Sequence, residues 1–132
     1  MTNKAMGLSP ACLKTLAPVE ANPNKSNQHE LNGVIELKAI LGLNDARYSA
    51  IFSVRGEPIT AVVDVTWYDA RAAHPKRTEH RLYFETNAVM ERAQAGDDLL
   101  IGFDKRGQLH CILIPRSTAG GGAKTDAWVS VT

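Results

Sequence analysis

The apolar residues of this chain fall into short runs bounded by turn-forming residues, a pattern that predicts strands rather than long helices. The clearest run is residues 59–68, ITAVVDVTWY, which is β-branched and alternates between apolar and polar positions. Residues 80–85, HRLYFE, are its expected antiparallel partner. Four further strands are expected, at residues 11–19, 46–54, 97–103 and 108–115. The last two flank the turn DKRG and are expected to form a hairpin.

Two short helices are expected between these strands. The first covers residues 34–41, whose apolar residues share one helical face, and Gly42 suits its C-terminal cap. The second covers residues 88–95, where Asn87 can cap the start and Gly96 can end the helix. Short strands joined mostly by hairpins favour a small barrel over an open sheet, with the helices at its ends. We therefore expect a mainly β single domain with two short helices.

Composition limits the size and the cellular setting of this domain. The chain has 132 residues, about one domain, and its 44% hydrophobic content is enough for a core, which must be mostly aliphatic because only 6% of residues are aromatic. Cys12 and Cys111 are far apart and form no CxxC pair, so free thiols in a cytoplasmic protein are expected. The opening MTNKAMGLSP lacks the apolar core of a signal peptide, and no run approaches the roughly 20 apolar residues that span a bilayer. We expect a soluble intracellular protein with no membrane partner.

The end of the chain has a different composition. Residues 117–132 are small, rich in glycine and without an apolar pattern, which is typical of a linker. The expected division is a folded domain at residues 1–116 followed by this tail, in a chain cut from something longer.

Candidate chemistry gathers in residues 71–81, RAAHPKRTEHR, between two strands that are expected to pair. The segment has four Arg or Lys, one Glu and two His, and Pro75 prevents the strands from simply continuing through it. The net charge of the whole chain is only +1, so a nucleic-acid function would have to rest on such a local patch. Arg and Lys on a projecting hairpin can reach phosphates or guanine edges, while Glu79 can accept from a cytosine amino group. A solvated charged hairpin is the alternative interpretation.

A second polar segment, residues 20–33, is rich in Asn, Pro and Ser and is long for a connection within a compact domain. Its residues 25–29 have hydrogen-bonding side chains of the kind that contact base edges or phosphates. A flexible surface loop is the alternative interpretation.

Other kinds of site lack a signature in the sequence. The His and Cys residues have no zinc-ligand spacing, HEL at 29–31 lacks the second His of HExxH, and AGGGAK at 119–124 is not a phosphate-binding loop. His110 and Cys111 are adjacent on an expected strand, so one of them should face the core. Nothing marks a Ser-His-Asp triad, and no acidic cluster suits Mg²⁺ in a nuclease. We expect no catalytic residue, metal site or cofactor in this domain.

The segment YDARAAHPKRTEHR, residues 68–81, resembles part of the N-terminal effector domain of EcoRII-type restriction endonucleases. That part runs Tyr-Asn-Ser-Arg, then five residues, then Arg-x-Glu-Lys-Arg, and it aligns without a gap. The identical positions are Tyr68, Arg71, Arg77, Glu79 and Arg81. The differing positions are Asp69 for Asn, Ala70 for Ser and His80 for Lys.

Two further segments are similar to that family. NQHELNG resembles its Gly-Gly-His-Gln-Val-Gly, with His29 as the matching residue and without the pair of glycines before it. Lys14 and Leu16 match a Lys-Arg-Leu segment if a gap is allowed.

The resemblance implies a DNA-binding pseudobarrel related to that of plant transcription factors, which grips the major groove with two projecting arms. Residues 20–32 would form the N-terminal arm and residues 69–81 the C-terminal arm. It also implies a CCWGG-like target, a bacterial cytoplasmic location, and a separate C-terminal nuclease domain in the parent Type II enzyme, which would need Mg²⁺.

The leading hypothesis is a sequence-specific double-stranded DNA-binding domain that acts as a monomer on each site. Arg71, Arg77, Glu79, His80 and His29 are the candidates for base edges. The full set of candidate DNA-binding residues is Lys14, Lys25, Ser26, Asn27, Gln28, His29, Asp69, Arg71, Lys76, Arg77, Glu79, His80 and Arg81. The alternatives are a small β-barrel enzyme or sugar-binding module with the charged hairpin over a pocket, and a protein-interaction domain.

Overall fold

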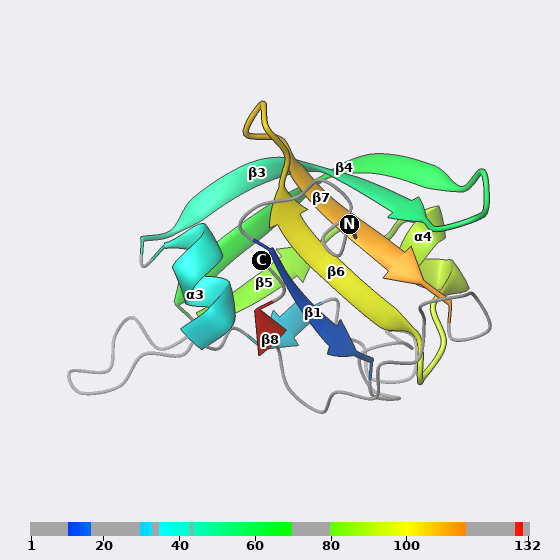
Figure 1. The fold of residues 1–132 in the computed structure, drawn as a ribbon. Helices are drawn as coiled ribbons and strands as arrows, with labels where there is room; N and C mark the ends of the chain where they lie inside the picture. Colours follow the sequence, from blue (N-terminus) through cyan, green and yellow to red (C-terminus); the bar gives the residue numbers. More distant parts are fainter. Residues whose placement is uncertain are drawn as a thin grey trace.

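Alternating strands and two short helices make up the described part of the chain (Figure 1). The computed structural model describes residues 11–16, 30–32, 35–42, 44–69, 80–115 and 129–130. The strands are β1 (Ala11–Thr15), β2 (Glu30–Asn32), β3 (Ala46–Val54), β4 (Thr60–Asp69), β5 (His80–Phe84), β6 (Asp98–Phe103), β7 (Leu109–Ile114) and β8 (Val129–Ser130). The helices are α3 (Ile35–Leu41) and α4 (Ala88–Arg92).

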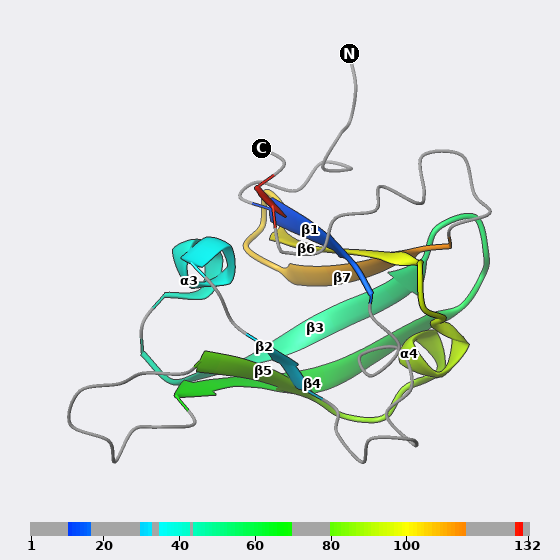
Figure 2. The same cartoon turned by 90° about the horizontal axis from the view of Figure 1, so that it is seen from below.

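These strands form one curled sheet in the order β2-β5-β4-β3-β7-β6-β1-β8. Neighbours in the described sheet are antiparallel except β3 and β7, which run parallel and join its two halves. Figure 2 shows the consequence: β3, β4 and β5 face β1, β6 and β7 across the interior, while α3 and α4 lie toward opposite ends. The expectation of a mainly β pseudobarrel with two short helices is confirmed.

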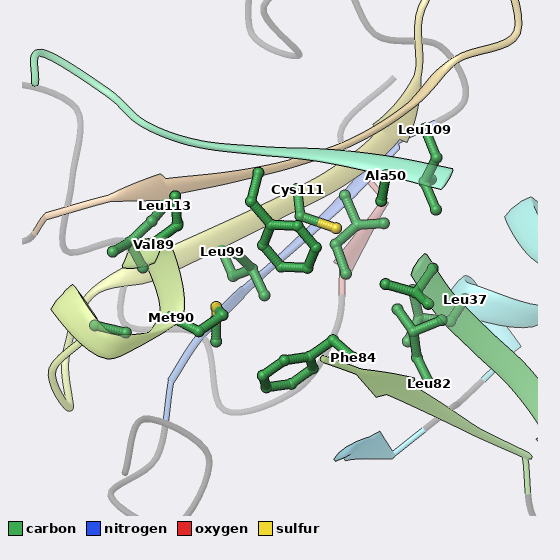
Figure 3. Close-up of a cluster of buried hydrophobic side chains, with 14 of the residues drawn as sticks. Leu37, Ala50, Leu82, Phe84, Val89, Met90, Leu99, Leu109, Cys111 and Leu113 are labelled. Atoms are coloured by element: carbon green, nitrogen blue, oxygen red, sulfur yellow. The ribbon is translucent and has the colours of Figure 1, made fainter. Parts of the chain in front are cut away.

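The core follows from the alternation seen in the sequence. Val65 and Trp67 of β4 and Leu82 and Phe84 of β5 are at most 1% exposed, because every second residue of each strand points inward. Aliphatic side chains from β6, β7 and both helices fill the space between the half-sheets (Figure 3). The expected aliphatic core is therefore present, with Phe52 packing on Phe84 at a ring-centroid distance of 6.1 Å.

A local signal sets the end of the first helix. Leu37 and Leu41 of α3 are buried, and Gly42 follows with φ 87°, a left-handed conformation that its missing Cβ permits. Its N–H donates to the Lys38 carbonyl at 2.8 Å, so Gly42 ends α3 as expected.

The second helix is shorter than expected. Asn87 Oδ1 accepts from the Met90 N–H at 3.0 Å, which confirms the N-cap. However, α4 ends at Arg92 rather than at residue 95. The Asp97 carboxylate accepts a hydrogen bond from the Gln94 N–H at 2.9 Å, and the backbone of Ala93 is extended. Gly96 has φ 95° in the turn before β6 and does not end the helix.

The two ends of the sheet also differ from the expected boundaries. β1 is described only to Thr15, followed by Leu16, and the remainder of the expected strand 11–19 lies outside the described residues. Val129 and Ser130 form β8 against Leu13 and Cys12 of β1, so this part of the expected linker belongs to the sheet. Residues 116–128 lie outside the described part of the chain.

Cys12 and Cys111 are both free, as the sequence predicted, and both are buried. Each pairs with Ile101 of β6 from opposite sides, so their backbones are two strand spacings apart, about 10 Å, which is beyond disulfide reach. Burial is the main cause that raises the pKa of the Cys111 thiol. Neither of the described helices has the length and apolar character that crossing a bilayer requires.

Candidate nucleic-acid interface

The described residues contain the roots of the two expected arms. Lys14, Asp69, His80 and Arg81 are described, and the other candidate DNA-binding residues lie outside the described part of the chain. Those others are Lys25, Ser26, Asn27, Gln28, His29, Arg71, Lys76, Arg77 and Glu79. The described geometry of the site is therefore that of β4, β5 and β2, the strands that carry these segments.

The C-terminal arm has its root between β4 and β5. The two strands are antiparallel, and their last pair is Asp69 opposite His80. Residues 70–79 consequently leave and re-enter the sheet at one point, which confirms the pairing expected from the sequence. This strand pair therefore carries the segment of residues 71–81 with its four Arg or Lys.

The N-terminal arm reaches the same strand from its other end. Its last residues form β2, in which Glu30 pairs with Tyr83 and Asn32 with Arg81 of β5. Because β2 and β5 are antiparallel, the chain enters β2 beside Tyr83, away from the root at His80. The two roots are thus about 10 Å apart along β5, from three residues at roughly 3.3 Å each. This spacing is comparable to the major-groove width of about 12 Å.

His80 does not occupy a position suited to a base contact. Its side chain is 3% exposed, and its ring stacks on Trp67 at a centroid distance of 5.1 Å and an angle of 28°. The cause is strand alternation, which places His80 on the inward face of β5 together with Leu82 and Phe84. The family alignment placed His80 among the base readers, whereas its burial gives it a supporting position at the root.

Trp67, which is not among the candidate residues from the sequence, connects this root to the first helix. The indole Nε1 donates to the Gly42 carbonyl at 3.0 Å, just after the last residue of α3. The Tyr48 hydroxyl of β3 donates to the neighbouring Leu41 carbonyl at 3.3 Å. Carbonyls at a helix C-terminus lack intrahelical partners, so these two side chains satisfy groups that α3 leaves open. Apart from an apolar residue on the buried face of β4, nothing in the sequence indicated this link.

The end of β4 is also held by the connection between α3 and β3. The backbone N–H of Asp69 donates to Asp45 Oδ1 at 3.2 Å. The Asp69 side chain is half-buried, and its candidate role at the DNA stays a prediction. Together, Asp45, Trp67 and His80 fix both strands at the point where the charged segment begins and ends.

Lys14 lies on a different part of the sheet. It is on β1, the strand that precedes the N-terminal arm, where it pairs with Leu99 of β6. The side chain of Lys14 is half-buried. The end of β1 is anchored by the Thr15 hydroxyl, which donates to Asp98 Oδ1 at 2.6 Å, and by the Leu16 N–H, which donates to the Asp97 carbonyl at 2.8 Å. The structure thus brings Asp69, His80 and Arg81 together and leaves Lys14 near the other root of the N-terminal arm.

Two polar clusters elsewhere have local structural explanations. At the tip of the β6–β7 hairpin, Asp104 Oδ2 lies 2.9 Å from His110 Nε2, while Asp104 Oδ1 accepts from the Arg106 and Gln108 N–H groups. The hydrogen bond with His110 is the main cause that lowers the pKa of Asp104. His110 is half-exposed and Cys111 is buried, which confirms that only one of them faces the core.

The second cluster joins α4 to the β3–β4 turn. Arg92 donates to both Glu57 carboxylate oxygens, at 3.1 and 2.8 Å, in a bidentate ion pair. This hydrogen bonding is the main cause that raises the pKa of Arg92. Within the described ranges, no group of three or more His, Cys, Asp or Glu side chains is placed to hold a metal ion.

The comparisons with known proteins assign no family to this arrangement. No protein-family model and no curated protein matches the chain.

Proposed function

We propose that this chain is a sequence-specific double-stranded DNA-binding domain of a Type II restriction endonuclease of the EcoRII type. The C-terminal and N-terminal arms enter the major groove from the two ends of β5. The domain contributes recognition, and catalysis belongs to a nuclease domain elsewhere in the parent enzyme. A CCWGG-like duplex is the proposed target.

The observation that supports this proposal best is the position of the two arm roots on one strand. Two polar segments that are separated by some 40 residues in the sequence join β5 at opposite ends, at a spacing comparable to the major groove. One of them contains four Arg or Lys among eleven residues, enough to contact several phosphates although the net charge of the chain is only +1. A pocket-based function offers no comparable reason for placing both segments on β5.

The proposed mechanism divides the arm residues into two classes. Lys76 and Lys25 neutralise phosphates and fix the position of the domain on the duplex. Arg71 and Arg77 fork onto guanine N7 and O6, and Glu79 accepts from a cytosine amino group, so these side chains discriminate between base pairs. Two unlike arms cover one groove face without a two-fold partner, which gives one protein per site.

A titration of the full chain tests the proposal. A fluorescently labelled CCWGG duplex and a scrambled duplex of equal length are titrated at two salt concentrations, and the anisotropy is measured. We expect tighter binding to the CCWGG duplex and an affinity that falls steeply with salt, because each neutralised phosphate releases counterions. Binding that is absent for both duplexes, or that does not change with salt, would contradict the proposal and favour a pocket or protein-interaction function.

A further inference from the structure

Two adjacent carboxylates are buried where the chain enters β6, and the proposed mechanism uses neither of them. Asp97 is 2% exposed and Asp98 is fully buried. Acidic side chains are almost never fully buried unless they are paired or hydrogen-bonded, so this placement has a structural cause. The hydrogen bonds of both residues lead to the end of β1.

Asp98 lies beside an apolar cluster, on the face of β6 that points away from the main core. It pairs directly with Thr15 of β1 and with Ile114 of β7. The next residue on the same face of β6 is Leu100, which belongs to a buried apolar cluster with Ile112 and Ile114. An aliphatic side chain would continue this cluster, whereas a carboxylate at the same position has to be stabilised by hydrogen bonds.

Thr15 supplies such a hydrogen bond. Its hydroxyl donates to Asp98 Oδ1 at 2.6 Å. This distance is in the range of O–H···O⁻ bonds, which are about twice as strong as hydrogen bonds between neutral groups. Backbone hydrogen bonds form between any two paired strands, but this bond needs these two side chains opposite each other. It therefore specifies which residue of β1 lies beside Asp98.

Leu16, the next residue along the chain, is held by the backbone of the same turn. Its N–H donates to the Asp97 carbonyl at 2.8 Å, and its carbonyl accepts from the Gly96 N–H at 3.0 Å. The Asp97 carboxylate in turn accepts from the Gln94 N–H at 2.9 Å, which fixes the shape of the turn. The end of β1 is thus attached to a turn that is itself defined by hydrogen bonds.

We infer that Thr15 and Asp98 are positioning residues, which fix the point from which the N-terminal arm starts. Leu16 is followed by residues 17–29, so the hydrogen bonds of Thr15 and Leu16 set where the chain leaves β1. This inference rests on the proposed function and adds to it two residues that act through the arm and do not contact the DNA.

Thr15→Val and Thr15→Ser test the role of the hydroxyl. Valine has nearly the shape of threonine but cannot donate to Asp98, whereas serine keeps the donor. Hydrogen exchange of the Leu16 N–H, measured by NMR relative to the amides of the β3–β4 ladder, reports local opening at the end of β1. In Thr15→Val we expect this exchange to be about ten- to a hundredfold faster, because a hydrogen bond to a charged group is lost. Thr15→Ser should exchange nearly as the unaltered chain does.

The same variants are titrated with the CCWGG and scrambled duplexes at a temperature at which all are folded. We expect Thr15→Val to weaken binding to the CCWGG duplex about three- to tenfold, since an arm with a less defined start loses more freedom on binding. Thr15→Ser should bind as the unaltered chain does. Ile112→Val is the matched control, because it removes one methylene from the same apolar face and keeps Thr15 and Asp98. It should change neither the relative exchange of Leu16 nor the affinity.

The outcomes separate this inference from the proposed function. If Leu16 exchanges equally slowly in Thr15→Val, or equally fast in Thr15→Ser and Thr15→Val, the inference is wrong while the proposed function stands. Faster exchange in Thr15→Val with unchanged affinity for the CCWGG duplex would also overturn the positioning role. If the unaltered chain binds neither duplex, both fail. Thermal denaturation checks folding, and Asp98→Asn, which keeps an acceptor without the charge, replaces Thr15→Val if that variant is unfolded, with a smaller expected effect on exchange.

Discussion

Replacing Trp67 by Phe should loosen the root of the C-terminal arm and so reduce discrimination between DNA sequences. Trp67 is fully buried, stacks on His80 at the last strand pair of the arm root, and donates to the Gly42 carbonyl at 3.0 Å. Phe retains part of the ring contact with His80 but cannot donate to Gly42. The β4 strand would then lose its connection to the end of α3.

The expected loss of stability can be estimated from these contacts. The hydrogen bond contributes about 1 kcal/mol net. Gly42 is exposed, so water can hydrate its carbonyl in the variant and the penalty stays near this value. The smaller ring removes apolar area worth roughly two methylene groups, about 1.6 kcal/mol. The free energy of unfolding should fall by about 2–3 kcal/mol, which thermal or denaturant unfolding can measure.

A matched variant separates stability from recognition. Phe52→Leu removes a buried aromatic ring that packs on Phe84, in the core rather than at the arm root, and should cost about 1–3 kcal/mol. Both variants are titrated with CCWGG and scrambled duplexes at a temperature at which both are folded. We expect Trp67→Phe to lower the ratio of the two affinities and Phe52→Leu to leave it unchanged. An unchanged ratio in Trp67→Phe, despite the expected loss of stability, would refute the idea that this root positions the arm.

Glu79→Ala should weaken binding to the CCWGG duplex, since the proposed cytosine contact is lost, while binding to random DNA stays equal or becomes tighter because a negative charge is removed. Lys76→Ala should weaken binding to both duplexes and lower the salt slope by about 1. If Glu79→Ala tightened binding to both duplexes, Glu79 would not be a base reader. Cys12 and Cys111 should react slowly with iodoacetamide in the folded protein and rapidly in denaturant, because both thiols are buried and burial raises the pKa of Cys111. Mass spectrometry measures the alkylation, and rapid modification of the folded chain at pH 8 would contradict the buried placement.

The sequence predicted most strands and the pairing of β4 with β5, because alternation and turn residues are local signals. The cap at Gly42 and the cap at Asn87 were predicted for the same reason. The parallel pairing of β3 with β7 and the return of β8 to β1 were not predicted, since each joins segments far apart in the chain without a local signature.

Within the candidate site, too, the sequence indicated features with a local signal and not contacts between distant segments. The charged segment between β4 and β5 was visible as composition, whereas the link from Trp67 to Gly42 depends on how the sheet curls around α3. His80 was grouped with the base readers by its alignment to a family position. The alternation of His80, Leu82 and Phe84 already indicated an inward side chain, and the structure follows that signal.

Under the proposed function, the attachment of both arms to β5 limits how the length of the recognised DNA sequence can change. Side chains of a strand alternate between faces, so inserting a single residue into β5 would turn Tyr83 inward and a core residue outward. Only insertions or deletions of two residues preserve the buried face of the strand. Each such step would move the arm roots by about 6.6 Å. Since base pairs are stacked at about 3.4 Å, the separation between the arms would change in units of about two base pairs.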